Sequence, residues 1–203
     1  MNLPNKLTVI RIALVPVFVV FLLIESIPHH YLIALLVFSA AAITDHFDGK
    51  IARKQNLITD FGKFADPLAD KILVMAAFIC FIELGLTGSV VVILMLSREF
   101  IVTSFRLVGA NKGTVIAANY WGKAKTVSQI VAILLVLGLR YVMELFELSI
   151  LPNQLFGLQN AMKTLLPCFQ IIGTIAVWIA AILTVLSGVV YVCDNWELIR
   201  QAK

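Results

Sequence analysis

The sequence has few charged residues for its length. Only 14% of its 203 residues are Asp, Glu, Lys or Arg, whereas 61% are hydrophobic, and the mean hydropathy is +0.97. Soluble globular domains carry about a quarter charged residues, so a water-soluble fold is excluded. The composition indicates an integral membrane protein, and no nucleic-acid partner is expected.

Cysteines and internal repeats are also scarce. Cys80, Cys168 and Cys193 are odd in number, widely spaced and surrounded by apolar residues, which excludes a disulfide framework or a CxxC metal site. We expect all three to act as small apolar residues. The sequence shows no low-complexity tract, and apolar stretches recur to its end rather than giving way to a polar domain. One membrane domain over residues 1–203 is therefore predicted.

Hydropathy predicts an all-α fold with six transmembrane helices, each near the 20 residues that cross about 30 Å of hydrocarbon. Gly173 and Gly188 predict close packing of the last span. A short interfacial helix is expected to lead into the first span, because Pro4 precedes an apolar run and Lys6 and Arg11 fall near the level of lipid phosphates. The predicted spans are 7–25, 31–50, 65–83, 89–108, 126–146 and 168–192.

Basic residues are distributed unevenly among the connections between these spans. Of the sixteen Lys and Arg residues, only Arg140 and Lys163 fall on one side of the predicted membrane. Because cytoplasmic connections carry the excess of Lys and Arg, both termini are predicted to be cytoplasmic.

The segment from Asp45 to Lys71 concentrates charge, with five aspartates and five Lys or Arg residues. Asp45 and Asp48 are three residues apart, and Asp66 and Asp70 are four apart, so each pair shares one face of a helix. Two helices joined by a short loop are antiparallel neighbours. The spacing therefore predicts that four carboxylates meet near the cytoplasmic boundary.

Four such carboxylates would repel one another without a cationic partner. Hard divalent cations prefer oxygen ligands, and paired cations are a recurrent device in phosphoryl transfer. The set contains no His or Cys, which favours Mg²⁺ or Mn²⁺ over Zn²⁺; His46 is expected to point elsewhere. An ordinary solvated loop explains the central charges from Lys54 to Asp60, but not the helical spacing of the aspartates.

Small residues and one arginine accompany the aspartates. Gly49, Ala52 and Gly62 leave room for a ligand or a second backbone to approach closely. The planar guanidinium of Arg53 suits bidentate contact with phosphate. These residues predict a diphosphate-binding site.

The spacing resembles the signature of the CDP-alcohol phosphatidyltransferases. It reads Asp45-x-x-Asp48-Gly49-x-x-Ala52-Arg53, eight residues, then Gly62-x-x-x-Asp66-x-x-x-Asp70. The stretches "PNKLTVIR", "FGKFADPLADK", "SREFIVTSFRL" and "GKAKT" resemble the bacterial members that make phosphatidylglycerol phosphate. This resemblance covers the first two-thirds of the chain, and the last third is similar only in being two hydrophobic spans.

The resemblance implies a specific activity. Family members are homodimers with six transmembrane helices and hold two divalent cations in a pocket open to the cytoplasm, here of a bacterial plasma membrane. CDP-diacylglycerol is the donor, and an alcohol, here sn-glycerol 3-phosphate, displaces CMP. The same likeness would make Asp45, Asp48, Asp66 and Asp70 the metal ligands and Asp70 the general base. The CDP-diacylglycerol site would comprise Asn5, Thr8, Asp48, Gly49, Ala52, Arg53 and Gly62.

An acceptor that carries a phosphate needs a second cationic site. Arg98 and Arg106 are eight residues apart on one face of the fourth span, and Lys123 and Lys125 begin the fifth. These four residues are the candidates for glycerol-phosphate binding. The positive-inside rule also accounts for the lysines, and an ion pair with Glu99 also accounts for Arg98.

The sequence leaves two alternatives to this function. The acceptor could be serine, inositol phosphate or phosphatidylglycerol, although the basic cluster favours a phosphorylated acceptor. A divalent-cation transporter would also place carboxylates in a membrane. Transporters ordinarily hold them near the midplane on repeated helices, whereas here they crowd one end and no inverted repeat is visible.

Overall fold

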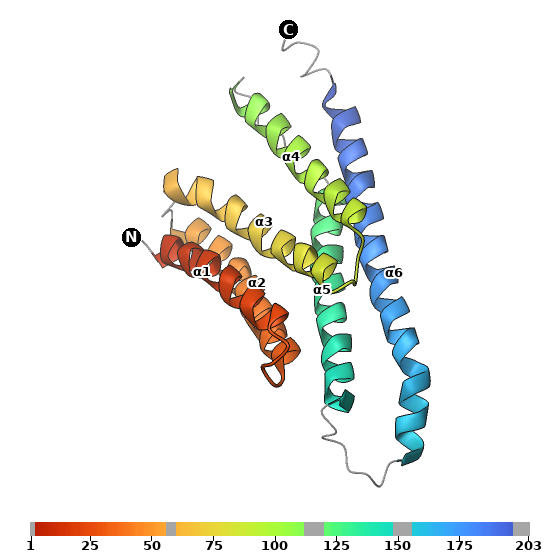
Figure 1. The fold of residues 1–203 in the computed structure, drawn as a ribbon. Coiled ribbons are helices and arrows are strands. Elements are labelled where there is room, and N and C mark those ends of the chain that lie inside the picture. Colours follow the sequence, from red (N-terminus) through yellow and green to blue (C-terminus); the bar gives the residue numbers. More distant parts are fainter. Residues whose placement is uncertain (1–2, 56–59, 112–119, 148–155, 197–203) are drawn as a thin grey trace.

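The computed structural model describes residues 3–55, 60–111, 120–147 and 156–196, and over these residues it is helical and contains no strand. Six helices follow one another along the described chain and form an open bundle (Figure 1). Each predicted span falls on one helix, and most helices extend beyond the span. The helices are α1 (Leu3–Leu23), α2 (His30–Gln55), α3 (Asp60–Glu83), α4 (Ser89–Asn111), α5 (Tyr120–Glu147) and α6 (Phe156–Asp194).

The outer surface of the bundle is apolar. Phe100 and Val90 of α4 are 69% and 66% exposed, an arrangement that suits contact with lipid rather than water. Among the described residues, three segments are long and apolar enough to cross a membrane, and His30–Thr44 of α2 is a shorter apolar segment. The three are Lys6–Leu23, Tyr120–Phe146 and Leu165–Asp194. The fold is that of a helical membrane protein.

The expected interfacial helix is not a separate element. α1 is continuous from Leu3 to Leu23, with Pro4 in the first turn, where a missing N–H costs little. Arg11, which was expected near lipid phosphates, is instead only 1% exposed, and Thr8 is fully buried. The two residues are three apart and so share one face of α1, a helix that packs on α2 and α3.

Aromatic and aliphatic side chains from all six helices form one core. The rings of Phe18 in α1 and Phe38 in α2 lie 5.7 Å apart, and those of Phe78 and Phe81 in α3 meet edge to face. Cys80 is buried in this core. None of the three cysteines forms a disulfide, as predicted.

The end of α3 is closed by a glycine cap. Gly85 has a φ of +66°, a conformation that glycine adopts without the steric cost of a Cβ. The N–H of Leu86 donates to the carbonyl of Phe81 at 2.8 Å, and that of Gly85 donates to Ile82 at 3.0 Å, the Schellman pattern. This turn ends α3 before α4 begins.

Two further contacts join α5 to its neighbours. The buried carboxylate of Glu144 accepts hydrogen bonds from the N–H groups of His30 (3.1 Å) and Tyr31 (3.3 Å) at the start of α2. A helix N-terminus carries partial positive charge, so this contact attaches α2 to α5. On the α6 side, a Cβ at Gly173 would lie 3.4 Å from Val136, which confirms close packing there.

Candidate functional site

A cavity of about 560 Å³ lies between α3, α4 and α5. Among the residues whose side chains are described, its lining carries five cationic side chains and one carboxylate, that of Glu99. The prediction that Arg98 and Arg106 lie on one face of an unbroken helix is confirmed, since both line this cavity. The cationic cavity, as we call it, contains Lys71, Arg98, Arg106, Lys123 and Lys125.

Glu99 holds two of these cations. Its side chain is 8% exposed, and its Oε1 accepts a hydrogen bond from Nζ of Lys125. The same oxygen lies 3.4 Å from Nη1 of Arg98. A buried charge is expensive unless it is paired, and here one carboxylate serves two cations. The Arg98–Glu99 ion pair, which the sequence offers as an alternative role for Arg98, is therefore present.

Arg98 also contacts α6. Its Nη2 donates to Oγ of Ser187 at 2.7 Å, while its buried Nε finds no acceptor among the described residues. The neighbouring Gly188 makes room for this side chain, because a Cβ there would lie 2.6 Å from Cγ of Arg98. Arg98 is thus held from two helices and keeps one donor unused within the described structure.

Lys71 is the cationic side chain that α3 contributes to the cavity lining. Its Nζ donates to Oγ1 of Thr103, and that hydroxyl donates in turn to the carbonyl of Glu99 at 2.7 Å. Lys71 directly follows Asp70, so the two α-carbons differ by about 100° and 1.5 Å along α3. The cationic cavity therefore begins one residue after the last aspartate of the signature.

The remaining two cations are more open. Arg106 is exposed and its guanidinium carbon lies 5.8 Å from the ring centre of Tyr191, within cation–π range. Lys123 is exposed at the start of α5. These two side chains differ from Arg98 and Lys125, which are largely buried against Glu99.

Arg98 borders a second space on its other side. An apolar groove of about 310 Å³ lies between α4 and α6 and is also lined by Leu94, Ile101 and Val185. Almost all of its surface is hydrocarbon. One side chain thus lines both the cationic cavity and an apolar groove.

The four aspartates lie on helical backbone, as the spacing predicted. Asp45 and Asp48 are in α2, and Asp66 and Asp70 are in α3, a helix that contacts α2. Their side chains lie outside the described part of the structure, as do those of Asn5, Ala52 and Arg53. No group of three or more His, Cys, Asp or Glu side chains gathers among the residues whose side chains are described. The described backbone at Gly49 and Gly62 is helical.

A comparison with protein families decides the family. The model of the CDP-alcohol phosphatidyltransferase family matches residues 1–186. The chain belongs to this family. As a CDP-alcohol phosphatidyltransferase it carries the complete aspartate signature on two helices that contact each other.

Curated members of the family are similar along most of the chain. CDP-diacylglycerol–glycerol-3-phosphate 3-phosphatidyltransferase of Bacillus subtilis is 41% identical over 210 aligned residues, covering 98% of this chain and 97% of that protein. The enzyme of the same name from Rickettsia bellii is 37% identical over 190 residues, covering 94% of this chain and 93% of that protein. A probable phosphatidylglycerophosphate synthase of Mycobacterium tuberculosis is 44% identical over 135 residues, covering 65% of this chain and 64% of that protein.

Sequence reasoning missed two charged residues of this phosphatidyltransferase's cationic cavity, Lys71 and Glu99, and one residue that holds Arg98, Ser187. Lys71 was counted only as part of the charged segment, although its place after Asp70 could have indicated its position. Glu99 was considered only as a partner of Arg98, and its contact with Lys125 joins residues 26 apart in the chain. Ser187 gave no signal, because a serine in an apolar helix is ordinarily a packing residue.

Proposed function

We propose that the protein transfers the phosphatidyl group of CDP-diacylglycerol to sn-glycerol 3-phosphate and releases CMP. The relatives named for this reaction align with almost the whole chain. The observation that carries the proposal is the cationic cavity, which begins one residue after Asp70. A cavity for an anionic acceptor therefore adjoins the helix that bears two of the signature aspartates.

The charge of the cavity favours a phosphorylated acceptor. The described side chains of the lining comprise five cations and one carboxylate, a positive excess that a phosphate dianion would offset. Lys123 and Arg106 are exposed and would contact the phosphate, and Lys71 on α3 lines the same cavity. Arg98 and Lys125 are largely buried, held in place by Glu99, and would add positive charge next to the phosphate. Serine carries no phosphate and would leave this excess uncompensated.

The aspartates suit divalent cations. Two of the four carboxylates are three residues apart on α2, and the other two are four apart on α3. Together they offer oxygen donors only, without nitrogen or sulfur. Asp45, Asp48, Asp66 and Asp70 would hold two Mg²⁺ or Mn²⁺ ions. When bound, these ions would neutralise the diphosphate and ease the departure of CMP.

Asp70 is the proposed general base. It would accept the proton of an acceptor hydroxyl while the oxygen forms a bond to the lipid-linked phosphorus and the bond from that phosphorus to CMP breaks. Arg53 with Gly49, Ala52, Gly62 and Asn5 would hold the cytidine diphosphate portion. Thr8 is fully buried, so its contact with the nucleotide would require the packing of α1 to open.

The same features support a proposal for the membrane arrangement. We propose six spans in a bacterial plasma membrane, with both termini and the cationic cavity on the cytoplasmic side and two chains in a homodimer. The start of α1 and the end of α6 lie toward the same end of the bundle (Figure 1), which supports this arrangement. The asymmetry of basic residues supports the orientation.

An acceptor screen tests the function. Purified protein would be given CDP-diacylglycerol and Mg²⁺ with sn-glycerol 3-phosphate, serine, inositol 3-phosphate or phosphatidylglycerol, and CMP release would be measured. We expect release with glycerol 3-phosphate, loss on chelation and recovery with Mg²⁺ or Mn²⁺. Release with a different alcohol would reassign the acceptor. No release with any alcohol, together with metal flux in vesicles, would support a transporter instead.

A further inference from the structure

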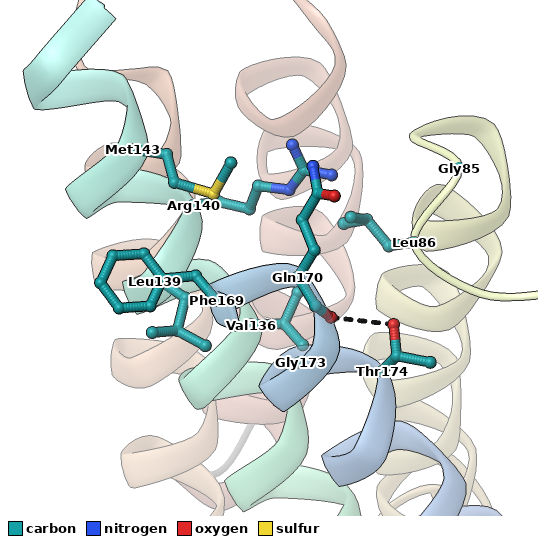
Figure 2. Close-up of a pocket in the computed structure, with 10 residues that line it drawn as sticks. All are labelled: Gly85, Leu86, Val136, Leu139, Arg140, Met143, Phe169, Gln170, Gly173 and Thr174. Atoms are coloured by element: carbon teal, nitrogen blue, oxygen red, sulfur yellow. Dashed lines mark hydrogen bonds between the residues drawn. The ribbon is translucent and has the colours of Figure 1, made fainter. Parts of the chain in front are cut away.

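A second, smaller cavity lies between the end of α3 and the helices α5 and α6 (Figure 2). Its volume is about 170 Å³, several times the ~30 Å³ that one water molecule occupies in the liquid. Arg140, the one charged residue among the described lining, follows Lys125 by fifteen residues on α5, which is about 22 Å along a helix. The cavity is therefore distinct from the cationic cavity.

Arg140 has no carboxylate within this second cavity. None of the ten described residues that line it is acidic. Glu144 lies one turn further along α5, but its two oxygens accept hydrogen bonds from the backbone of His30 and Tyr31. A guanidinium in a membrane protein ordinarily pairs with an anion or faces water, because its desolvation is costly.

The polar part of the lining is rich in donors. Figure 2 shows the guanidinium of Arg140 and the side-chain amide of Gln170 directed to the same side of the cavity. Thr174 donates its hydroxyl proton to the carbonyl of Gln170 at 2.9 Å, so this proton is already used. Arginine offers up to five N–H donors and glutamine two, a combination that suits the oxygens of a phosphate.

The other part of the lining is apolar and continues onto the outer surface. Leu86, Leu139 and Phe169 line the cavity, while Ile171 and Ile175 of α6 are more than half exposed beside it. A phosphate attached to acyl chains would place its oxygens on Arg140 and its hydrocarbon on this surface. Basic pockets between membrane helices bind lipid head groups in this way.

We propose that this cavity binds a phosphate group, carried by the head group of a membrane phospholipid, with Arg140 and Gln170 as donors. The site lies outside the proposed donor and acceptor sites, so it does not depend on the proposed reaction. Its volume admits the phosphate but not the whole lipid, whose acyl chains would lie against α6.

Photolabelling tests this site on the full-length protein in detergent. The probe is a phosphatidylglycerol with a diazirine in its acyl chain, and the labelled peptides are mapped by mass spectrometry. We expect labelling of residues 136–143 and 169–175, reduced about tenfold by Arg140→Gln because a hydrogen bond to a charged group is lost. Gln170→Leu should give a smaller reduction. Lys6→Gln removes the same charge from the exposed surface of α1, away from this cavity, and should leave labelling unchanged.

Three comparisons decide the outcome. A diazirine diacylglycerol, which has the same chains without phosphate, should label these residues weakly; equal labelling would overturn the proposal. Labelling should persist with saturating CDP-diacylglycerol, and displacement would mean that the probe had entered the donor site. Excess inorganic phosphate that displaces the probe would identify free phosphate as the ligand, whereas persistence identifies the lipid. Unchanged labelling in both variants would also overturn the site.

Discussion

Two glutamates, Glu99 in α4 and Glu144 in α5, are buried, and the negative charge of each is compensated by a different kind of partner. Each is less than 10% exposed. Glu99 pairs with the side chains of Arg98 and Lys125, whereas Glu144 accepts hydrogen bonds from two backbone N–H groups of α2. The partners of Glu99 are side-chain cations that also line the cationic cavity, where a ligand could share them. The partners of Glu144 are fixed dipoles that serve only to join two helices.

The difference separates a binding region from a structural one. Around Glu99 the cations outnumber the carboxylate among the side chains that the structure describes, so this part of the cationic cavity keeps a positive excess. Around Glu144 the carboxylate and the helix terminus compensate each other. Substitutions near Glu99 should therefore change substrate binding, and substitutions at Glu144 should change stability alone.

The largest loss of activity is expected from a substitution in α3, the helix that carries Asp70 and lines the cationic cavity. Asp70→Asn should lower CMP release by about 10²- to 10⁴-fold, because a general base is lost. Asp60→Asn, a change of the same kind at the start of α3, should have little effect. Near wild-type turnover by Asp70→Asn with metal binding retained would contradict the assignment of the base and would place the chemistry elsewhere.

Glu99→Gln should be the next most severe change. It leaves Arg98 and Lys125 buried without their shared carboxylate, and breaking a buried ion pair costs about 3–5 kcal/mol. The apparent melting temperature in detergent should fall, and glycerol 3-phosphate should raise it more than in the wild type, because its phosphate would replace the missing charge. An unchanged melting temperature would remove the distinction between the two glutamates.

Gly188→Ala tests whether the position of Arg98 matters. The added methyl group would lie 2.6 Å from Cγ of Arg98, so the side chain must shift from Ser187. Overpacking of this kind costs about 1–3 kcal/mol, and the KM for glycerol 3-phosphate should rise. Gly138→Ala is the matched control, because nothing lies within 4 Å of a Cβ there. Equal behaviour of the two variants would show that Arg98 accommodates the change without consequence.

Lys123→Gln should affect binding without affecting the fold. Loss of one charge-assisted hydrogen bond predicts a KM for glycerol 3-phosphate about tenfold higher, with the KM for CDP-diacylglycerol unchanged. Lys6→Gln, an exposed change on α1, serves as the control. A parallel rise in both KM values would indicate a general electrostatic effect instead of acceptor binding.

Glu144→Gln should give the smallest effect and a different one. Its amide oxygen still accepts a hydrogen bond from α2, but the charge–dipole interaction is lost, at a cost of about 1 kcal/mol. The melting temperature should fall slightly while both KM values stay the same. A change in the KM for glycerol 3-phosphate would mean that the two ends of α5 are coupled.

Much of the fold could be predicted from the sequence because its signals are local. Hydropathy located one helix for each predicted span, and the spacing of Asp45 with Asp48 predicted helical backbone where α2 has it. The extra length of the helices was not predicted, since their polar ends lack the hydropathy signal. The burial of Arg11 was also missed, because its surroundings depend on how α1 packs against other helices.

In the candidate site, too, the features within one helix could be predicted, whereas the contacts between helices could not. The positions of Arg98 and Arg106 on one face follow from helix period alone. The contact of Glu99 with Lys125, that of Arg98 with Ser187 and that of Lys71 with Thr103 join different helices and depend on how these helices cross. Sequence spacing carries no information on such crossings.

Arg98 has a further consequence for the environment of the site. It lines the cationic cavity on one side and the apolar groove between α4 and α6 on the other. A polar compartment and a hydrocarbon compartment are therefore separated at this point by the thickness of a single side chain. Shortening that side chain would connect the two compartments, so Arg98 sets the boundary between two solvents as well as the charge of the cavity.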